Sequence, residues 1–300
     1  MKVALIGLEP VFGASLQTML RARGFDVRLG TELLQPGRHL ANIRALLRMD
    51  IVHYLQGQLA VRHQLPRAML RRPAVVHWSG TDVLAVAKYG ALGSALIRSF
   101  FRHSSAVHLA DSPDLAREAA VWAGYEPQVV RLLPVSIKGQ ILPLPKTFTA
   151  LSFWHRDRED FYGRSTVLRL AELFPQVQFV VIVDDVPPRD QWPANLTYLP
   201  FQASLEGLWP QISCLIRVVK HDSLSAMVLE ALSRGRYVIY SKAFPHAAQA
   251  ADAESARLAL QDLLTRPGPN VAGAAYVNEH FDPEAEVDKV VAVYERLYRT

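Results

Sequence analysis

The sequence predicts an α/β fold, and three of its features lead to that prediction. Short β-branched and aromatic runs alternate with longer segments whose apolar residues recur at helical spacing. Glycine or proline stands at many of the points where one kind of segment gives way to the other. The alternation restarts after residues 136–146, a stretch with two prolines, one glycine and little periodicity. We therefore expect two domains, each built on a parallel sheet, joined by this linker.

The length and composition fit two soluble domains. Three hundred residues suffice for one large or two ordinary domains, and half of them are hydrophobic. No apolar run approaches the ~20 residues that cross a bilayer, and residues 1–7 are too short for an export signal. The single cysteine, Cys214, cannot form an internal disulfide. We expect a cytoplasmic protein.

The charge is unevenly distributed along the chain. Residues 1–150 hold 18 Lys and Arg against 9 Asp and Glu, a net of +9, whereas residues 151–300 have a net of −4. A basic first half could face an anionic acceptor, or make the protein peripheral at the inner face of an acidic membrane. An ordinary solvated surface explains the same count equally well. We expect no nucleic-acid partner.

The first residues predict the opening of a Rossmann-like domain. Residues 2–6 form a strand, 7–13 a loop with glycine at each end, 14–23 a helix and 25–29 the next strand. The spacing of Gly7 and Gly13 is not G-x-G-x-x-G, and no acidic residue ends the second strand as a dinucleotide site requires. An NAD(P)-linked oxidoreductase is therefore poorly supported.

Two basic helices follow, at residues 39–48 and 61–72, with a strand at 51–55 between them. Such helices can rest on a membrane interface, but helices that cover a sheet have the same pattern. We favour packing on the sheet. A helix at 88–103 mixes apolar residues with Arg98 and Arg102. It could bind a lipid-linked acceptor, although packing in the core is the commoner cause of its pattern.

A strand that ends at His77 and a polar loop through Asp82 form the most informative part of the first half. A histidine at the carboxyl end of a parallel strand is well placed for chemistry, although a hydrogen-bonded imidazole inside the domain is the alternative. Asp82 either orients a hydroxyl group or the loop, or caps a helix. A strand at 106–110, a helix from Ser112-Pro113 to Gly124 and a strand at 129–134 complete this half.

The second half repeats the strand–helix alternation. Arg156 and Arg158 stand just past its first strand, where guanidinium groups can clamp a diphosphate, unless the loop is simply a solvated charged one. The expected strands are 147–154, 178–183 and 196–201, and the expected helices are 166–174, 205–209, 253–265, 272–281 and an amphipathic 284–300.

Residues 214–241 predict a strand, loop, helix and strand, the unit of a parallel sheet. The polar loop 221–225 lies at the carboxyl end of a strand and at a helix N-terminus, whose N–H groups and partial positive charge suit a phosphate. Glu230 lies about two turns into the helix and could accept hydrogen bonds from sugar or ribose hydroxyls. Alternatively, Asp222 or Ser223 is only an N-cap and Glu230 only a solvated helix residue.

The stretch from Asp222 to Gly235 resembles the donor-site motif of the retaining, GT-B-fold glycosyltransferases of family 4. That motif has two acidic residues separated by seven, here Asp222 and Glu230. The strings HWSGTDV and HLADSPDLAREAAVWAG resemble the first domain of the same family. The resemblance implies two Rossmann-like domains facing a cleft, with residues 1–138 on the acceptor side and 139–283 on the nucleotide-sugar side. Residues 284–300 would form a C-terminal helix crossing back to the first domain.

The resemblance also implies an activity, a hexosyltransferase-like transfer from a nucleotide-diphosphate sugar to an acceptor hydroxyl with retention of configuration. A UDP-sugar is the expected donor and a glycan or lipid-linked molecule the expected acceptor, with no cofactor and no metal. The implied catalytic residues are His77 and Asp222, and the acceptor-side residues are Gly13 and Asp82. The implied donor-binding residues are Arg156, Arg158, Arg217, Lys220, Ser223, Leu224, Ser225 and Glu230.

Two positions depart from the family pattern. The family usually has Glu where this chain has Asp222, and Lys where it has Tyr162, although Arg164 or Lys220 could supply the missing charge. These departures motivate the alternative function, a non-catalytic nucleotide- or glycan-binding protein on the same fold.

Overall fold

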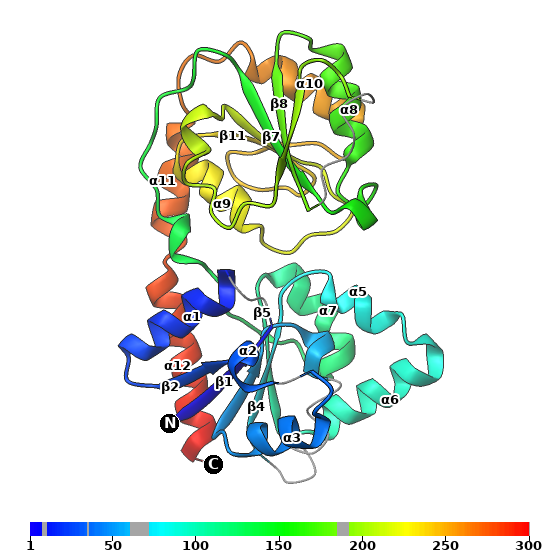
Figure 1. The fold of residues 1–300 in the computed structure, drawn as a ribbon, viewed down its shortest axis with the longest axis vertical. Helices are drawn as coiled ribbons and strands as arrows, with labels where there is room; N and C mark the ends of the chain where they lie inside the picture. Colours follow the sequence, from blue (N-terminus) through cyan, green and yellow to red (C-terminus); the bar gives the residue numbers. More distant parts are fainter. Residues whose placement is uncertain (8–10, 35, 61–71, 185–191, 300) are drawn as a thin grey trace. The chain divides into compact units, whose positions relative to one another are not determined.

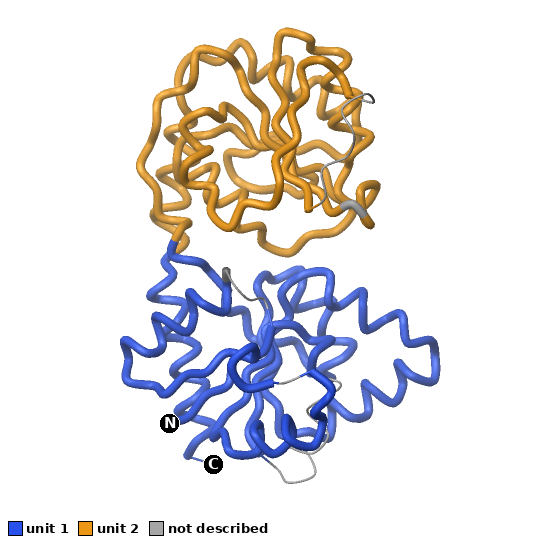
Figure 2. Tube along the Cα trace, viewed as in Figure 1, with its two compact units in different colours: residues 1–135, 282–300 blue, residues 136–281 orange. Residues whose placement is uncertain are grey.

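The computed structural model describes residues 1–7, 11–34, 36–60, 72–184 and 192–299 (Figure 1). The chain divides into two units: unit 1 comprises residues 1–135 and 282–300, and unit 2 comprises residues 136–281 (Figure 2). Most of the predicted helix at 61–72 lies outside the described residues. None of the helices in the described ranges is long and apolar enough to span a bilayer.

Unit 1 is built on a parallel sheet of six described strands in the order β2-β1-β3-β4-β5-β6. The strands are β1 Lys2–Ile6, β2 Asp26–Leu29, β3 Ile51–Tyr54, β4 Ala74–Trp78, β5 Ala106–Ala110 and β6 Gln128–Val129. The helices are α1 Val11–Ala22, α2 Gly30–Leu33, α3 His39–Leu47, α5 Asp82–Ala87, α6 Gly90–His103, α7 Pro113–Ala123 and α12 Pro283–Arg299.

Helices cover both faces of this sheet, because successive strand side chains point to opposite sides. Val3 and Leu5 of β1 pack with α1 and α12, whereas Ala4 and Ile6 pack on the side of α3, α5, α6 and α7. The last helix, α12, belongs to unit 1 although it follows unit 2 in the chain. Its Tyr294 is fully buried in the core with α1. The predicted return of the C-terminal helix to the first domain is therefore confirmed.

Two predictions for unit 1 need correction. Helix α1 begins three residues earlier than predicted, because Phe12, Leu16 and Met19 share one face and pack on the sheet. The strand predicted at 129–134 is much shorter, since β6 ends at Val129. Beyond it, the amides of Arg131 and Leu132 donate to carboxylates instead of a neighbouring strand.

Unit 2 has a second parallel sheet of six described strands, in the order β12-β11-β10-β7-β8-β9. The strands are β7 Thr149–Trp154, β8 Gln178–Val183, β9 Leu196–Pro200, β10 Cys214–Arg217, β11 Tyr237–Tyr240 and β12 Ala248–Gln249. The helices are α8 Arg164–Leu173, α9 Ala226–Ser233, α10 Ala253–Leu263 and α11 Val271–His280, with 3-10 turns η1 Val135–Ile137, η2 Arg156–Arg158 and η4 Trp209–Gln211.

The strand–loop–helix–strand unit at 214–241 is confirmed, with α9 and β11 at the predicted residues. The short helix predicted at 205–209 is wrong, because the chain forms only a turn there before η4, where Pro210 lacks the N–H that an α-helix needs. The edge strand β12 was not predicted, since two residues carry no periodic signal.

Candidate functional site

Two loops meet at the carboxyl edge of the unit 2 sheet. Gly163 is the N-cap of α8 and has φ 74°, and a Cβ atom there would lie 2.1 Å from the carbonyl oxygen of Val218. Two residues earlier, the carbonyl of Phe161 accepts a hydrogen bond from the Lys220 amide at 3.0 Å. The loop after β7 therefore lies directly on the segment after β10.

This contact brings basic residues of the two loops to one edge. The side chains of Arg158 and Lys220 are both exposed there. Arg156 contributes backbone to η2, but its side chain lies outside the described atoms. Arg164 is less available, because its Nε lies 3.4 Å from Oε2 of Glu159.

Asp222 is held by two neighbouring strands. Nε of Arg217, the last residue of β10, donates to Oδ2 of Asp222 at 2.6 Å, and the hydroxyl of Tyr240 on β11 donates to the same oxygen at 3.0 Å. Burial raises the pKa of Asp222, but the Arg217 charge and these hydrogen bonds outweigh it and hold the pKa below its usual value. The carboxylate is therefore ionised and fixed, and it engages the charge of Arg217.

The loop before α9 is supported by a lysine that the sequence analysis missed. Nζ of Lys242 donates to the carbonyls of Asp222, at 3.0 Å, and Ser223, at 3.4 Å. Lys242 stands two residues past the end of β11, so its position after a strand end was the signal that could have found it.

Helix α9 starts at the end of this loop. Its N-cap is Ser225, with extended backbone and no side-chain capping bond, so the alternative in which Asp222 or Ser223 caps the helix is wrong. Ser223 and Ser225 are buried and Leu224 is half-buried. The first N–H groups of an α-helix have no partners within its regular ladder. In α9 the Val228 amide donates to the carbonyl of Ser225, and the loop that carries Asp222 leads directly into this first turn.

Glu230 is buried on α9, with 8% of its surface exposed, so the alternative of a solvated helix residue is also wrong. Its Oε1 accepts a hydrogen bond from Oγ of Ser136 at 2.5 Å. Burial raises the pKa of Glu230, and the Ser136 bond opposes that rise only in part. The carboxyl group is therefore held against the first residue of unit 2.

Arg234 holds Ser136 beside Glu230. The sequence analysis did not identify Arg234 as a site residue. Its Nη2 donates to the carbonyl of Ser136 at 3.1 Å and pairs with Glu206, while Nη1 donates to the carbonyl of Glu230 at 3.2 Å. The guanidinium carbon lies 5.9 Å from the ring centroid of Trp209. Basic residues are common at helix C-termini for purely structural reasons, so the position of Arg234 at the end of α9 gave no signal of a role in the site.

Asp82 organises the carboxyl edge of the unit 1 sheet. Its Oδ2 accepts from the Gly57 amide at 2.6 Å, and its Oδ1 accepts from the amides of Ser79 at 3.3 Å and Gly80 at 3.0 Å. These bonds tie the segment after β3 to the loop after β4. Burial raises the pKa of Asp82 to about 7, with a smaller contribution from nearby Asp111. The N-cap of α5 is Thr81, so Asp82 orients the loop and does not cap the helix.

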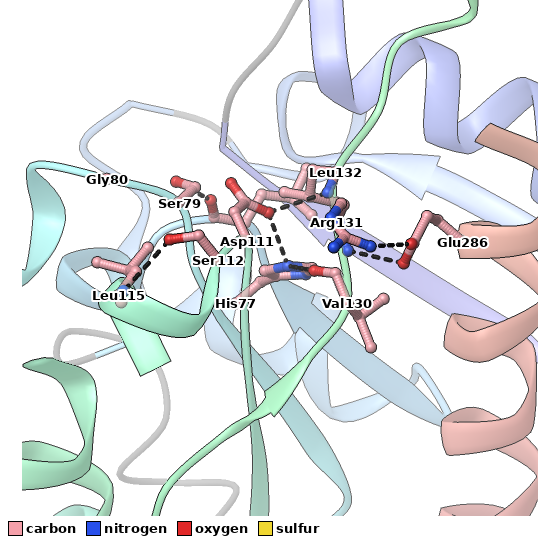
Figure 3. A network of polar contacts seen from close by, with 12 residues as sticks. His77, Ser79, Gly80, Asp111, Ser112, Leu115, Val130, Arg131, Leu132 and Glu286 are labelled. Atoms are coloured by element: carbon pink, nitrogen blue, oxygen red, sulfur yellow. Dashed lines mark hydrogen bonds and ion pairs between the residues drawn. The ribbon is translucent and has the colours of Figure 1, made fainter. Parts of the chain in front are cut away.

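His77 belongs to a polar network in the same unit, and Figure 3 shows it beside Val130 and Asp111. It is fully buried; its Nε2 lies 2.7 Å from the Val130 carbonyl and its Nδ1 lies 3.2 Å from Nε2 of His53. Nδ1 of His53 lies 2.7 Å from the hydroxyl of Tyr294 on α12. The geometry is that of the hydrogen-bonded imidazole inside the domain, and a part in catalysis stays a prediction.

Nε2 of His77 carries a proton, because the two groups that face it, the Val130 carbonyl and the Asp111 carboxylate, only accept. The other ring nitrogens link His77 to His53 and His53 to the hydroxyl of Tyr294. Burial lowers the pKa of His53 well below its ordinary value, with a further contribution from His77, so His53 is neutral.

Asp111, which the sequence analysis missed, joins this network to the sheet edge. Its Oδ1 lies 3.1 Å from Nε2 of His77 and accepts from the Leu132 amide at 2.9 Å, and Figure 3 shows it beside the loop of Ser79 and Gly80. An acidic residue directly after a strand was the available signal. Its position before the Ser112 cap made it look like part of a helix start.

Gly13 lies in the first turn of α1 and not in a loop. It is buried, and its immediate predecessors at 8–10 lie outside the described residues. Contact with an acceptor remains a prediction for Gly13.

No protein-family model matches the chain, and no curated protein sequence matches it. Solved structures do. HepE of Anabaena in complex with UDP-glucose superposes with a TM-score of 0.77 at 13% identity, over 99% of this chain and 100% of that one. Sucrose-phosphate synthase of Thermosynechococcus elongatus gives 0.77 at 13%, over 100% and 99%. A glycosyltransferase of Rickettsia africae gives 0.72 at 8%, over 99% and 98%.

Identities this low establish the fold alone. The chain, with its two parallel sheets, superposes on the first two of these structures over essentially the whole length of both chains. The chain therefore has the GT-B fold, and the predicted fold class is confirmed.

Proposed function

We propose that the protein is a glycosyltransferase that moves a sugar from a UDP-sugar to an acceptor hydroxyl with retention of configuration. The support from comparison is that the fold is shared with HepE, whose structure holds UDP-glucose, and with sucrose-phosphate synthase. A shared fold does not fix function, so the proposal depends on the site.

The observation that carries the proposal is the contact between the two loops of unit 2. Gly163 against Val218, and the Lys220 amide on Phe161, hold a basic loop beside the loop that leads into α9. A diphosphate bound there would meet the exposed charges of Arg158 and Lys220 together with the N–H groups of the α9 N-terminus.

This arrangement suits the chemistry of the leaving group. In the transfer, the bond between the anomeric carbon and a UDP oxygen breaks and UDP leaves with the bonding electrons. The acceptor oxygen forms the new bond and its proton departs. Fixed cations and helix amides stabilise the charge that develops on the diphosphate, which is the main task of such a site.

Asp222 and Glu230 have the geometry of two different anchors. Oδ1 of Asp222 accepts from the Ser223 amide and has capacity left for a sugar hydroxyl. Arg217 orients the carboxylate from the other side. We assign the ribose hydroxyls to Glu230, since its Oε1 already accepts from the hydroxyl of Ser136 and Oε2 is the second acceptor.

The acceptor side is assigned to unit 1. His77 is buried with both ring nitrogens in hydrogen bonds, so we assign it a positioning role exerted through Asp111. Asp82 holds the two loops beside which an acceptor hydroxyl would lie. The acceptor is a glycan or lipid-linked sugar.

The first experiment identifies the donor. Each nucleotide sugar of a panel is added to the protein and the melting temperature is measured, because a ligand that binds only the folded state raises it. A UDP-sugar is expected to give the largest shift, and UDP release is then followed with and without acceptors. Binding without turnover across donors and acceptors contradicts the transferase, as does the absence of a shift with every UDP-sugar.

Variants then locate the site. Arg158→Gln and Lys220→Gln are each expected to weaken donor binding about tenfold, the cost of one charge-assisted hydrogen bond. Arg169→Gln, which removes an exposed charge on α8, is the matched control. Glu230→Ala is expected to weaken nucleotide binding without unfolding the protein, whereas His77→Asn should lower turnover more than donor affinity. Equal effects of Lys220→Gln and the control contradict the assignment.

A further inference from the structure

Helix α6 of unit 1 exposes a contiguous apolar face. Ile97 and Phe101 turn inward and are buried, whereas Leu92 is 77% exposed and Leu96 is 64% exposed. These two leucines are four residues apart, so they are neighbours on one side of the helix. In Figure 1, α6 lies at the outer margin of unit 1.

The apolar face continues into the preceding turn and helix. Tyr89, directly before α6, is 48% exposed, and Leu84 on α5 is 39% exposed. Single exposed leucines are normal on protein surfaces, but a group of them within 13 residues, on elements that contact each other, marks an interaction surface. We name Leu84, Tyr89, Leu92 and Leu96 the α6 face.

The charges along residues 83–110, which include α6, are all of one sign. Residues 83–110 contain Lys88, Arg98 and Arg102 but no Asp or Glu. Arg98 and Arg102 are four residues apart and lie toward α7: the Arg98 guanidinium is 5.7 Å from the Trp122 ring centroid, and the Arg102 side chain packs on Gly124. Of the two acidic residues on α7, Asp114 is paired with Arg117, and Glu118 is exposed one turn before Trp122. The apolar face therefore has a basic border.

We propose that the α6 face docks on the surface of an anionic lipid bilayer. Leucines and a tyrosine would enter the boundary between headgroups and acyl chains, and Lys88, Arg98 and Arg102 would lie at the level of the anionic headgroups. An uncharged apolar partner would not explain the basic border, and a second copy of this chain would set that border against itself. The proposal is independent of the proposed sugar transfer.

The test is co-sedimentation of the full chain with two kinds of vesicle: phosphatidylcholine alone, and phosphatidylcholine mixed with phosphatidylglycerol. The protein is expected to bind the mixed vesicles at least about tenfold more tightly, and added salt should weaken the binding. The double variant Leu92→Glu/Leu96→Glu should lower binding by more than about tenfold, because it removes the two leucines that would be buried in the bilayer. Leu258→Glu, at a leucine 54% exposed on α10, is the matched control and should leave binding unchanged.

A second pair of variants tests the basic border. Arg98→Gln/Arg102→Gln is expected to weaken binding to the mixed vesicles severalfold, and Arg169→Gln/Arg257→Gln in unit 2 is expected not to. Thermal unfolding and UDP-sugar binding are measured for every variant, so that a loss of fold is recognised. The proposal is overturned if the wild type binds neither vesicle or both equally. It is also overturned if Leu258→Glu matches the double variant, or if light scattering shows a dimer that Leu92→Glu/Leu96→Glu dissociates.

Discussion

Units 1 and 2 are built alike, but they differ in how the polar side chains of their sheets are paired and charged. Unit 2 keeps charges at the carboxyl edge of its sheet and pairs them, as in Arg217–Asp222. Unit 1 buries neutral histidines, and it holds Asp82 with backbone amides. Strand-end geometry alone therefore does not define an anion site. The proposed anion site needs cations and a helix start at the same edge, and unit 2 has Arg158, Lys220 and the start of α9 there.

The physical origin of the difference is the cost of burying charge. Burial lowers the pKa of His108 to about 3, and burial together with His77 lowers the pKa of His53 well below its ordinary value, so both rings stay neutral. Asp222 keeps its charge because Arg217 and Tyr240 compensate for its burial. The two units are thus expected to respond differently to mutation and to pH.

The largest effect is expected at Gly163. Gly163→Ala adds a Cβ atom 2.1 Å from the Val218 carbonyl, on top of a positive φ, and should lower the free energy of unfolding by more than about 3 kcal/mol. Gly268→Ala is the matched control, since Gly268 has φ 76° and nothing within 4 Å of an added Cβ. It should cost about 1 kcal/mol. Chemical denaturation measures both, and similar losses would show that the loop contact is not tight.

Arg234 is expected to come next. Arg234→Gln removes an ion pair with Glu206 and bonds to the carbonyls of Ser136 and Glu230, and should cost about 3 kcal/mol. Arg257→Gln, which breaks an exposed pair within α10, should cost less than about 0.5 kcal/mol. Donor titration should also show weaker binding in Arg234→Gln, because Glu230 loses its support. If Arg234→Gln is as stable as Arg257→Gln, Arg234 does not hold Ser136 and Glu230 in place.

The pH response should separate the units. His53 and His108 bind protons below pH 6.5 when unfolded but not in the fold, so the free energy of unfolding falls as pH drops below 6.5. Asp82 acts in the opposite sense, because its pKa is about 7 in the fold and 3.8 otherwise, so its contribution is lost as pH rises through 7. The two histidines and the one carboxyl group together leave the unfolded state of unit 1 with one more bound proton than the folded state. The free energy of unfolding of unit 1 should therefore fall by about 1.4 kcal/mol for each pH unit between roughly pH 6 and 4.

The measurement is hydrogen exchange at several pH values, corrected for the intrinsic rate, on peptides covering β4–β5 and β7–β8. Between pH 6 and 4 the unit 1 peptides should lose more protection than the unit 2 peptides, because the raised pKa of Glu230 acts the other way in unit 2, and the lowered pKa of Asp222 acts mainly near and below the ordinary value of 3.8. His108→Asn should flatten the unit 1 response. An unchanged response in that variant would exclude His108 as a contributor.

The smallest effect is expected at Lys242. Lys242→Gln weakens the bonds to the carbonyls of Asp222 and Ser223 and should cost about 1 kcal/mol of stability. Donor affinity should fall a few-fold, because the loop before α9 is less well held. Calorimetric titration with the donor measures this. An affinity equal to that of the wild type would show that the loop is fixed without Lys242.

The elements that sequence periodicity can reach were predicted well. β1, β5, β8, α9 and β11 lie at the predicted residues, since each has a strong apolar pattern bounded by turn residues. The errors arose where backbone groups bond to side chains, as in the segment after β6, whose amides bond to Asp111 and Glu286. Such pairings join residues far apart in the chain, and no local pattern encodes them.

The candidate site shows the same limit. The sequence singled out Asp222 and Glu230, but not the partners that hold them, Arg234 and Lys242. His77 was placed at a strand end by its position, yet its burial depends on His53 and on Tyr294 of the last helix. Motif spacing identifies groups on one element, whereas the burial and pairing of those groups depend on elements contributed from elsewhere.

The most direct test of the central claim is hydrogen exchange of the wild-type protein with and without UDP-glucose. Slower exchange is predicted in peptides covering 157–163 and 218–227, the two loops that meet at Gly163 and the start of α9. Peptides from β8 should not change. Unchanged exchange at 218–227 under saturating UDP-glucose, or protection confined to unit 1, would contradict a diphosphate site at the edge of unit 2.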